Sequence, residues 1–312
     1  MSKCLYCYKE LGPDEHDFHA SCARKFFGTA EAPVMEYTRA DMDRLAEKII
    51  QSQTTLTGVQ PKLSLNLQQH EGSRHLTIVG LWGYYIFKPQ TDNYPQLPEN
   101  EDLTMHLAEI AKIKTAQHSM IRLADQSLGY LTKRMDRDTK GNKLAMEDFC
   151  QLTERQTEYK YRSSYEQIAK AIAKYSSTPQ LDLVNYYELL LFCWLTGNND
   201  MHLKNFSLIG NGHGGYGLSP AYDLLNVAIA NLKDTEELAL TLNGKKKRIT
   251  LKDFKIAASQ VDIPEKVIDG MAAHFRKCLP KWEATIANSF LAKELQQSYL
   301  ELLHDRFERI KA

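Results

Sequence analysis

The sequence lacks an excess of charge of either sign. Its 312 residues include 39 lysines and arginines and 39 aspartates and glutamates, so the formal net charge is zero. A protein dedicated to nucleic-acid binding usually carries a clear basic excess. We therefore expect no direct binding of nucleic acid.

Long hydrophobic runs are also missing. The most apolar stretch, residues 189–195, is far shorter than the roughly 20 residues that cross a bilayer. The first residues lead into charged ones and not into the apolar core of a secretory signal. These absences predict a cytoplasmic protein with no membrane association, long enough to fold as two lobes.

Cysteine is scarce outside the first 22 residues. Three of the six cysteines stand alone at positions 150, 193 and 278, as inert core cysteines commonly do. The other three form a C-x-x-C pair and then an H-x-x-C pair, and two short ligand pairs flanking a loop are typical of small zinc sites. The predicted zinc ligands are Cys4, Cys7, His19 and Cys22, with His16 as a substitute.

This segment, which we take to cover residues 1–28, has two other interpretations. The cysteines could be free thiols of a metal-free turn, or a redox pair, although no βαβ pattern surrounds them. Four protein ligands would leave a bound zinc ion no open position, so such a site would be structural.

Residues 29–132 are expected to form a β-rich lobe. Alternating apolar and polar residues predict a strand over 62–67, and two further strands are expected over 76–79 and 84–88. The loop 54–62 lacks the Walker pattern, although its small residues would let backbone amides approach phosphate oxygens.

A lysine at the end of one of these strands is a candidate nucleotide ligand. Lys88 ends an apolar strand, and a helix opens near Pro98 with Glu101 in its first turns. A strand lysine held by a helix glutamate can bind nucleotide phosphates. The alternative is a solvated lysine and an acid that merely favours the helix dipole.

After residue 132 the sequence is mainly helical. Helices are expected over 164–175 and 183–196, and the second is so apolar that it should be buried. A glycine-rich, hairpin-like link follows at 210–215. The domain that we predict here covers residues 133–312.

The residues that follow the apolar helix carry the chemistry. Asp200 and Asn205 are five residues apart, and a second carboxylate follows at Asp223. A phosphoryl-transfer enzyme needs an Asp to accept the proton of the attacking hydroxyl, and an Asn and a further Asp to hold magnesium. These three residues are therefore the predicted base and magnesium ligands.

Two neighbours of Asp200 have alternative roles. His202 could hold the loop by a hydrogen bond or assist at the nucleotide, and we favour the first role. Lys204 could stabilise charge on the transferred phosphoryl group, or it could be a surface lysine.

Taken together, the motifs resemble those of the HipA family of serine/threonine kinases, known from bacterial toxin–antitoxin modules. Six segments match in order over about residues 50–230, namely 57–63, 86–89, 99–101, 133–137, 197–206 and 222–224. The resemblance implies an α+β, bilobal protein-kinase-like fold with a β-rich N-lobe and an all-α C-lobe. The Cys/His segment is not part of the family pattern.

The resemblance also implies the remaining nucleotide contacts, with ATP and Mg²⁺ as cofactors. Asp200 would be the catalytic base and Lys88 would contact the phosphates. The hinge beside adenine would be residues 132–135, and loop 54–62 would bind phosphate. The residues implied in these two segments are Gly58, Gln60, Lys62, Lys133 and Met135.

In this family the phosphate loop is also an autophosphorylation site, usually on serine. Here the hydroxyls in the loop belong to Thr55 and Thr57. A phosphate adds about two negative charges, which would repel the phosphates of ATP.

The resemblance is to the short, HipT-like branch of the family, because only about 50 residues precede the loop. It implies a separately encoded N-terminal-subdomain protein and a DNA-binding antitoxin as partners. It also implies a protein substrate of the translation machinery, such as an aminoacyl-tRNA synthetase.

Two other functions are compatible with these residues. A lipid or small-molecule kinase would use the same chemistry, although neutral charge and the lack of an amphipathic membrane helix argue against a lipid surface. A non-catalytic pseudokinase scaffold would usually lack one of the residues Lys88, Asp200, Asn205 and Asp223.

Overall fold

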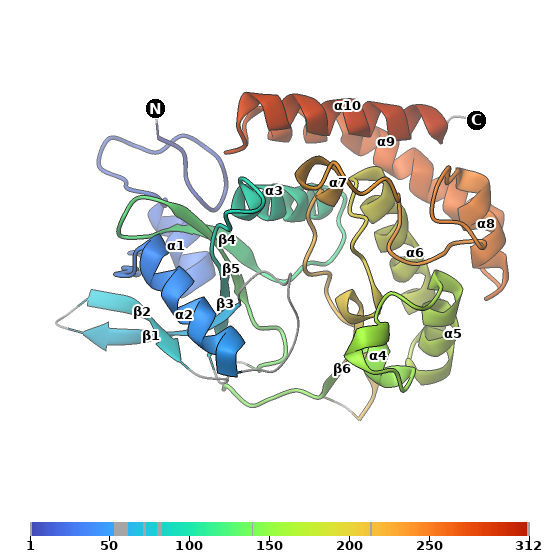
Figure 1. Ribbon diagram of the computed structural model, residues 1–312, viewed down its shortest axis with the longest axis horizontal. Coiled ribbons are helices and arrows are strands. Elements are labelled where there is room, and N and C mark those ends of the chain that lie inside the picture. The colour runs from blue at the N-terminus through green and yellow to red at the C-terminus, as the bar shows by residue number, and fades with distance from the viewer. Residues whose placement is uncertain are drawn as a thin grey trace. The chain divides into compact units, whose positions relative to one another are not determined.

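The computed structural model describes residues 2–52, 62–70, 73–79, 83–138, 140–212 and 214–310, without the side chains of residues 46–52 and 70. The chain forms two compact units, whose elements are labelled in Figure 1. Unit 1 consists of Met1–Asp102, Ala116–Met135 and Asn288–Phe290. Unit 2 consists of Leu103–Thr115, Asp136–Ala287 and Leu291–Ala312.

Unit 1 is built on a five-stranded antiparallel sheet with strand order β2-β1-β3-β5-β4. The strands expected near residues 62, 76 and 84 are confirmed. The bounds are β1 (Leu63–His70), β2 (Ser73–Val79), β3 (Tyr85–Lys88), β4 (His118–Arg122) and β5 (Leu128–Lys133).

The burial of the strand residues explains the position of Lys88. Leu63 and Leu65 of β1 are buried, as their alternation predicts. The strand β3 pairs with both β1 and β5, so it lies at the centre of the sheet, and Phe87 is fully buried in it. Lys88 is the last residue of this central strand and is therefore held on a rigid element.

Two helices, α1 (Ala20–Phe27) and α2 (Arg39–Ser52), complete unit 1 together with the start of α3 (Leu97–Ile110). The apolar face of α1 packs against the sheet, where the rings of Phe26 and Phe27 lie 5.9 and 6.2 Å from that of Tyr85 in β3. Gly28 ends α1 in the left-handed conformation with φ of 80°. The Cys/His segment is thus continuous with a helix that packs on the strand of Lys88.

Unit 2 is mainly helical, as expected, but it also holds a three-stranded sheet with order β6-β7-β8. The strands β7 and β8 flank the link at 210–215, so the hairpin interpretation is confirmed. The bounds of the strands are β6 (Met146–Asp148), β7 (Ser207–Gly210) and β8 (Tyr216–Leu218). The α-helices wholly within the unit are α4 (Phe149–Leu152), α5 (Tyr165–Tyr175), α6 (Pro179–Leu195), α7 (Val227–Ala230), α8 (Leu251–Ser259), α9 (Glu265–Ala287) and α10 (Lys293–Arg309).

The central element of unit 2 is α6, whose last seven residues are all buried. It contacts α5, α9 and α10, and α9 and α10 run side by side (Figure 1). The ring of Phe192 in α6 meets that of Trp282 in α9 edge-on at 5.6 Å. Within the described ranges, no helix combines the length and the apolar character that crossing a membrane requires.

A charged cluster ties α6 to α10. The Glu237 carboxylate accepts hydrogen bonds from Trp194 Nε1 at 3.0 Å, Arg306 at 2.5 Å and Arg309 at 2.9 Å. Burial alone would raise the pKa of Glu237, but hydrogen bonds from Arg309 and Trp194 and the charge of Arg306 lower this pKa to about 2. The folded state therefore favours the ionised carboxylate.

We expect the substitution Glu237→Gln to lower the free energy of unfolding by about 2 kcal/mol at pH 7, because Arg306 loses a counter-charge. The depressed pKa contributes stability above pH 4.5, and this contribution is lost as the pH falls toward 2. Urea unfolding at several pH values measures the effect. In the control, Asp269→Asn removes an exposed ion pair with Lys255 and should change stability by less than about 0.5 kcal/mol. Equal losses in the two variants would contradict the prediction.

Candidate active site

In unit 1, Lys88 and Glu101 form a buried ion pair. Lys88 Nζ lies 2.7 Å from Oε1 and 2.8 Å from Oε2 of Glu101, and the two side chains are 5% and 2% exposed. Tyr130 supplies an aromatic face 5.5 Å from the same nitrogen. Burying two charges costs desolvation energy that their attraction often does not repay, so stability alone is a poor explanation for this pair. It is the pair that the sequence predicted, and it is the arrangement in which kinases present a lysine to nucleotide phosphates.

The start of α3 carries two further acids. Asp102 is fully buried and accepts from Tyr8 and His118 at 2.7 Å each. No described residue donates to Oε2 of Glu99, which is buried. Burial, and to a lesser degree the charge of Asp102, raises the pKa of Glu99 to about 7.

In unit 2, the buried helix α6 delivers the predicted catalytic loop. Thr196 follows α6 and closes it by donating from Oγ1 to the Phe192 carbonyl at 2.9 Å. Gly197 then takes φ of 74°, and a Cβ at this position would lie 2.5 Å from Oδ1 of Asn226. Only glycine satisfies both the backbone angle and this close approach. The loop that starts here is therefore positioned by a rigid core helix.

Hydrogen bonds across the loop fix Asp200 relative to Asn205. The Asn205 side-chain nitrogen donates to the Asp200 carbonyl at 3.0 Å, and the His202 amide donates to the same carbonyl at 2.8 Å. A short 3-10 helix, Leu203–Asn205, completes the turn. Because the Asn205 nitrogen is used in the loop, the amide oxygen is the atom that a hard cation could use.

Asp223 is joined to the same loop by two contacts. Asn198 donates to the Asp223 carbonyl at 3.3 Å, and the neighbouring Tyr222 hydroxyl donates to the Lys204 carbonyl at 2.9 Å. Asp223 has φ of 61°, a left-handed conformation that is uncommon for a residue with a side chain. Such outliers concentrate at functional sites. The backbone segments of the three predicted residues Asp200, Asn205 and Asp223 thus form one hydrogen-bonded assembly. The carboxylate and amide oxygens of these residues are of the kind that binds Mg²⁺.

Two residues of this assembly were not identified from the sequence. Tyr161 donates its hydroxyl to Oδ1 of Asp200 at 2.6 Å, and its ring meets that of His202 at 4.9 Å. Asp148 pairs with Lys204 at 2.6 Å, so the predicted phosphoryl-stabilising lysine has a carboxylate partner. Burial, and next the charge of Asp200, raises the pKa of Tyr161, which therefore stays a protonated donor. Neither residue lies in a motif, and only long-range packing brings them here.

The remaining predicted nucleotide contacts belong to two other segments of the chain. Gly58, Gln60, Thr55 and Thr57 lie outside the described residues. Lys62 is exposed just before β1, and Met135 is half-buried at the end of the second segment of unit 1. The Lys133 ammonium lies 5.4 Å from the ring of Phe26, and burial lowers its pKa.

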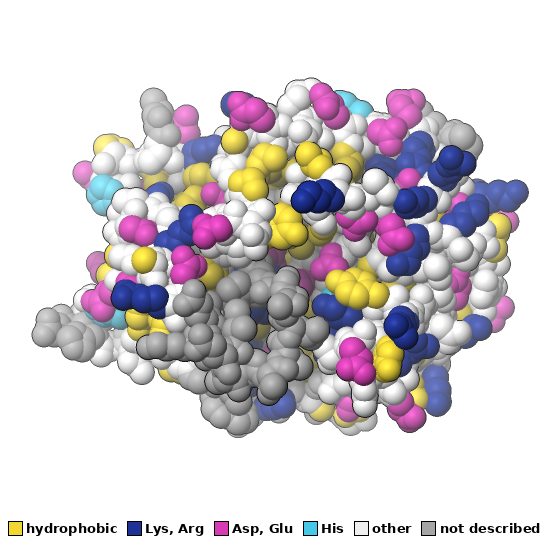
Figure 2. All heavy atoms as spheres, viewed as in Figure 1, with side chains coloured by type: hydrophobic (Ala, Val, Ile, Leu, Met, Phe, Trp, Pro, Cys, Tyr) yellow, Lys and Arg dark blue, Asp and Glu magenta, His cyan; other side chains and the backbone are white. Residues whose placement is uncertain are grey.

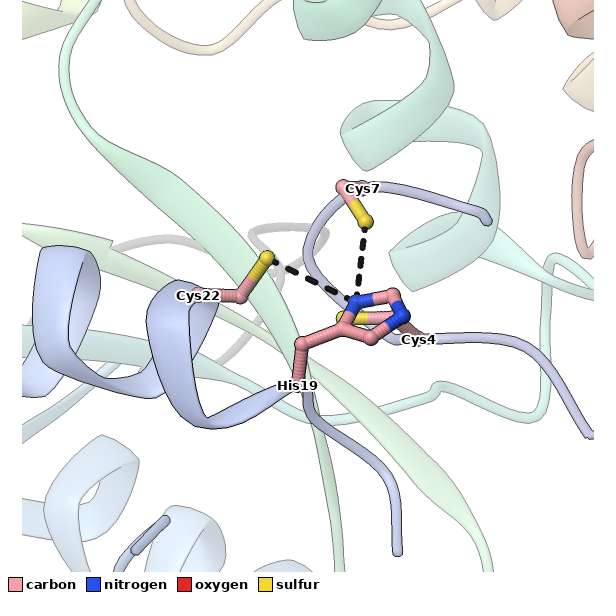
Figure 3. A group of neighbouring side chains, drawn as sticks. All are labelled: Cys4, Cys7, His19 and Cys22. Carbon is pink, nitrogen blue, oxygen red and sulfur yellow. Dashed lines mark hydrogen bonds between the residues drawn. The ribbon is translucent and has the colours of Figure 1, made fainter. Parts of the chain in front are cut away.

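The four predicted zinc ligands lie together in unit 1 (Figure 3). Ligand atoms of Cys4, Cys7, His19 and Cys22 are all within 4.8 Å of one another. His19 Nδ1 lies 3.4 Å from the Cys7 sulfur and 3.8 Å from the Cys22 sulfur, while its Nε2 lies 2.9 Å from the Glu10 carbonyl. That second contact orients the ring as second-sphere partners of metal-bound histidines do.

The thiol chemistry of the cluster fits a cation. Burial, followed by the neighbouring Cys4, raises the pKa of Cys22 to about 12. Cys22 is therefore a neutral thiol at pH 7 unless a cation binds beside it. Three sulfurs and one imidazole nitrogen form a common donor set for structural zinc.

In Figure 2, Lys and Arg side chains gather over the part of unit 2 that contains α8, with Asp and Glu side chains among them. The lysine-rich loop near residue 245 follows this pattern, because Lys245 pairs with Asp253 at 2.8 Å and Lys246 pairs with Glu236 at 3.0 Å. These two lysines are thus partly neutralised by carboxylates within unit 2.

Comparison with known sequences identifies related proteins. The profile of the family described as HipA-like C-terminal domain matches residues 54–282. A Sinorhizobium fredii protein described as "Putative kinase Y4dM" is 31% identical over 77% of this chain and 62% of its own length. A Haemophilus influenzae protein described as "Putative kinase" is 28% identical over 56% of this chain and 53% of its own length. This chain thus spans less than two thirds of these relatives.

Solved structures show the same fold. The Shewanella oneidensis toxin–antitoxin complex of HipA and HipB with operator DNA matches with a TM-score of 0.70 and 20% identity, over 90% of this chain and 72% of that one. The Helicobacter pylori proinflammatory kinase CtkA matches with a TM-score of 0.56 and 14% identity, over 80% of this chain and 93% of that one. The expected α+β kinase-like fold, with a β-rich N-terminal part and a helical C-terminal part, is confirmed.

We expect Glu99→Gln to stabilise the protein above pH 7 and to leave it unchanged below pH 4.5. Between these values the folded state retains a proton that the unfolded state has released, so wild-type stability falls as the pH rises. The gain at pH 8 should reach about 3 kcal/mol, because each pKa unit corresponds to about 1.4 kcal/mol. Urea unfolding from pH 4 to 8 measures it, with Glu31→Gln at an exposed position as the control. A gain that did not vary with pH would contradict the assignment.

Alanine substitutions at Gly197 and Gly244 distinguish the effect of a steric clash from that of backbone strain. Both have positive φ, but a Cβ at Gly244 meets nothing within 4 Å, whereas one at Gly197 meets Asn226. We expect Gly244→Ala to cost about 1 kcal/mol. Gly197→Ala should cost at least about 1 kcal/mol more, because Asn226 must move as well. Thermal unfolding of the two variants checks this order, and the reverse order would refute the steric argument.

Proposed function

This chain belongs to the family of HipA-like C-terminal domain proteins, and on that premise we propose that it is an ATP-dependent serine/threonine protein kinase. The observation that carries the proposal is the hydrogen-bonded assembly of Asp200, Asn205 and Asp223 in unit 2. The buried pair of Lys88 and Glu101 in unit 1 supports it.

The proposed reaction assigns one role to each group. Asp200 accepts the proton of the substrate hydroxyl while the hydroxyl oxygen forms a bond to the γ-phosphorus of ATP. The bond between the γ-phosphorus and the β,γ-bridging oxygen breaks, and ADP is released. Lys88 binds phosphate oxygens, and Glu101 holds the lysine in place. Asn205 and Asp223 would hold magnesium, which would neutralise charge on the phosphates.

Tyr161 and Lys204 modify this scheme. The Tyr161 hydroxyl already donates to Asp200 at 2.6 Å, so the carboxylate can hold a hydroxyl in the way that a substrate serine or threonine requires. Lys204 is held by Asp148, and we propose that this pair presents the lysine to the phosphoryl group. His202, which packs on Tyr161, then keeps the loop in shape.

The proposed partners are those that the family resemblance suggests. The Shewanella oneidensis relative is solved together with HipB and operator DNA. We propose that this chain likewise works with a DNA-binding antitoxin, that it binds a separately encoded N-terminal-subdomain protein, and that its substrate is a translation protein of the aminoacyl-tRNA synthetase class. Assignment to the HipT-like branch and self-phosphorylation at Thr55 or Thr57 stay predictions.

The Cys/His cluster would hold zinc in a structural role. Its four ligand atoms lie close enough together, and its donor set leaves no position for a substrate. The cluster is therefore assigned no part in the chemical step.

Mass spectrometry after incubation with Mg-ATP tests the kinase assignment. We expect phosphate on the peptide containing Thr55 and Thr57 of the wild type, and a rate at least about 100-fold lower for Asp200→Asn, which lacks the general base. Asp269→Asn, an exposed substitution in the same unit, should match the wild type.

The other outcomes separate the alternatives. ATP hydrolysis or transfer to small molecules without protein phosphorylation would favour a small-molecule kinase. Failure of the wild type to bind ATP at all would overturn the kinase proposal and leave a scaffold.

A further inference from the structure

We propose that the Cys/His cluster, when it holds a metal ion, positions the start of helix α3 through Tyr8 and Asp102, and thereby the glutamate that holds Lys88. In this view Tyr8 is a positioning residue, and nucleotide affinity depends on a metal ion that never touches the nucleotide. The consequence for ATP rests on the proposed function, whereas the coupling between the cluster and α3 does not.

The link begins directly beside a predicted metal ligand. Tyr8 follows Cys7, and its hydroxyl donates to Oδ2 of Asp102 at 2.7 Å in a fully buried contact. Asp102 follows Glu101 in α3, so the two carboxylates move together with the helix backbone. One hydrogen bond thus connects the cluster to the residue next to the lysine's partner.

A second series of contacts connects Asp102 to Lys88 through His118 and Tyr130. Oδ1 of Asp102 lies 2.7 Å from His118 Nδ1 in β4, and the His118 ring stacks on Tyr130 at 6.1 Å. Tyr130 is the residue whose ring faces the Lys88 ammonium at 5.5 Å. Displacing Asp102 would therefore disturb both members of the buried ion pair.

Two further contacts anchor the segment that carries the ligands. Asp17, two residues before His19, pairs with Arg122 of β4, with Nε at 2.9 and 3.0 Å from its carboxylate oxygens. On the other side, Cys22 lies in α1, whose Phe26 and Phe27 pack on Tyr85 of β3. The cluster therefore joins three elements of unit 1: α3, β4 and β3.

The backbone at Tyr8 explains why this link needs the metal. Tyr8 has φ of 63°, a left-handed conformation that is costly for an aromatic residue and persists only where its surroundings impose it. Residues 2–18 contain no helix or longer strand. The Tyr8 amide donates to the Cys4 carbonyl at 2.9 Å, and its carbonyl accepts from Asn288 at 2.9 Å, so its conformation is part of the turn between the two cysteines. Loss of the metal would free Cys7, allow Tyr8 to relax and withdraw its hydroxyl from Asp102.

The test uses the full chain and compares ATP with adenosine. Because the Lys88–Glu101 pair faces phosphates in the proposed function, Tyr8→Phe should retain one zinc ion per chain and bind Mg-ATP about tenfold more weakly, the loss typical of one hydrogen bond to a charged group. Its affinity for adenosine should be unchanged. Removing zinc from the wild type with a chelator under reducing conditions should produce the same selective loss, and adding zinc back should reverse it.

Controls keep the result interpretable if a ligand variant does not fold. Cys22→Ser should lose affinity for both metal and ATP. If this variant does not fold, Tyr8→Phe and the chelated wild type still test the proposal. Tyr37→Phe, at a half-exposed tyrosine of the same unit, should match the wild type. The rate of amide hydrogen exchange in Leu97–Asp102 measures the coupling between the cluster and α3 without any nucleotide. We expect this rate to increase in Tyr8→Phe and when zinc is removed by the chelator.

Three outcomes would overturn the proposal. These are a wild type that neither contains nor takes up zinc, zinc removal that leaves exchange in α3 unchanged, and equal loss of ATP and adenosine binding in Tyr8→Phe. If the zinc-loaded wild type bound no ATP, the kinase proposal would fail, and hydrogen exchange alone would decide whether the cluster positions α3.

Discussion

The costliest constraint in unit 1 is the burial of carboxylates at the start of α3. Glu101 and Asp102 are almost fully shielded from water. The pKa of the partly buried Glu99 is raised to about 7, so this residue avoids a buried charge by keeping its proton below that pH. A buried carboxylate is tolerated only where cations or hydrogen-bond donors surround it. Lys88 of the sheet and Tyr8 of the N-terminal segment supply those groups. The acids of one helix therefore depend on both of these parts of unit 1.

The corresponding constraint in unit 2 is that polar groups must be held in fixed positions at the end of an apolar helix. Thr196 and Gly197 end α6 abruptly, and the loop that follows is hydrogen-bonded to itself and to the segment of Asp223. A site built on a packed helix needs little reorganisation when a ligand binds. The unfavourable backbone angle at Asp223 fits this view, because the neighbouring contacts hold it there.

Much of this arrangement could be predicted from local sequence patterns. The strands of unit 1, the buried helix α6, the pairing of Lys88 with Glu101 and the clustering of Cys4 with His19 all follow from periodicity or from motif spacing. These features depend on residues close in sequence, or on a strand and helix that follow one another. Local chemistry alone is enough to suggest them.

The contacts of Tyr161, Asp148 and His118 could not be predicted in the same way. Tyr161 reaches Asp200 across 39 residues, and Asp148 reaches Lys204 across 56. Tyr8 and Asp102 are 94 residues apart. A tyrosine or an aspartate outside a motif carries no sign of such a partner, because tertiary packing alone selects it. The nucleotide contacts expected at Gly58 and Gln60 lie outside the described residues.

The division of the chain into two units has a practical consequence for dissecting the protein. The polypeptide passes from one unit to the other five times, after residues 102, 115, 135, 287 and 290. Neither unit is therefore a continuous stretch of sequence, and no single cut yields either one intact. A fragment that stops before Asn288 lacks part of unit 1 as well as the end of unit 2. Point substitutions, and not truncations, are the appropriate means of assigning functions to the two units.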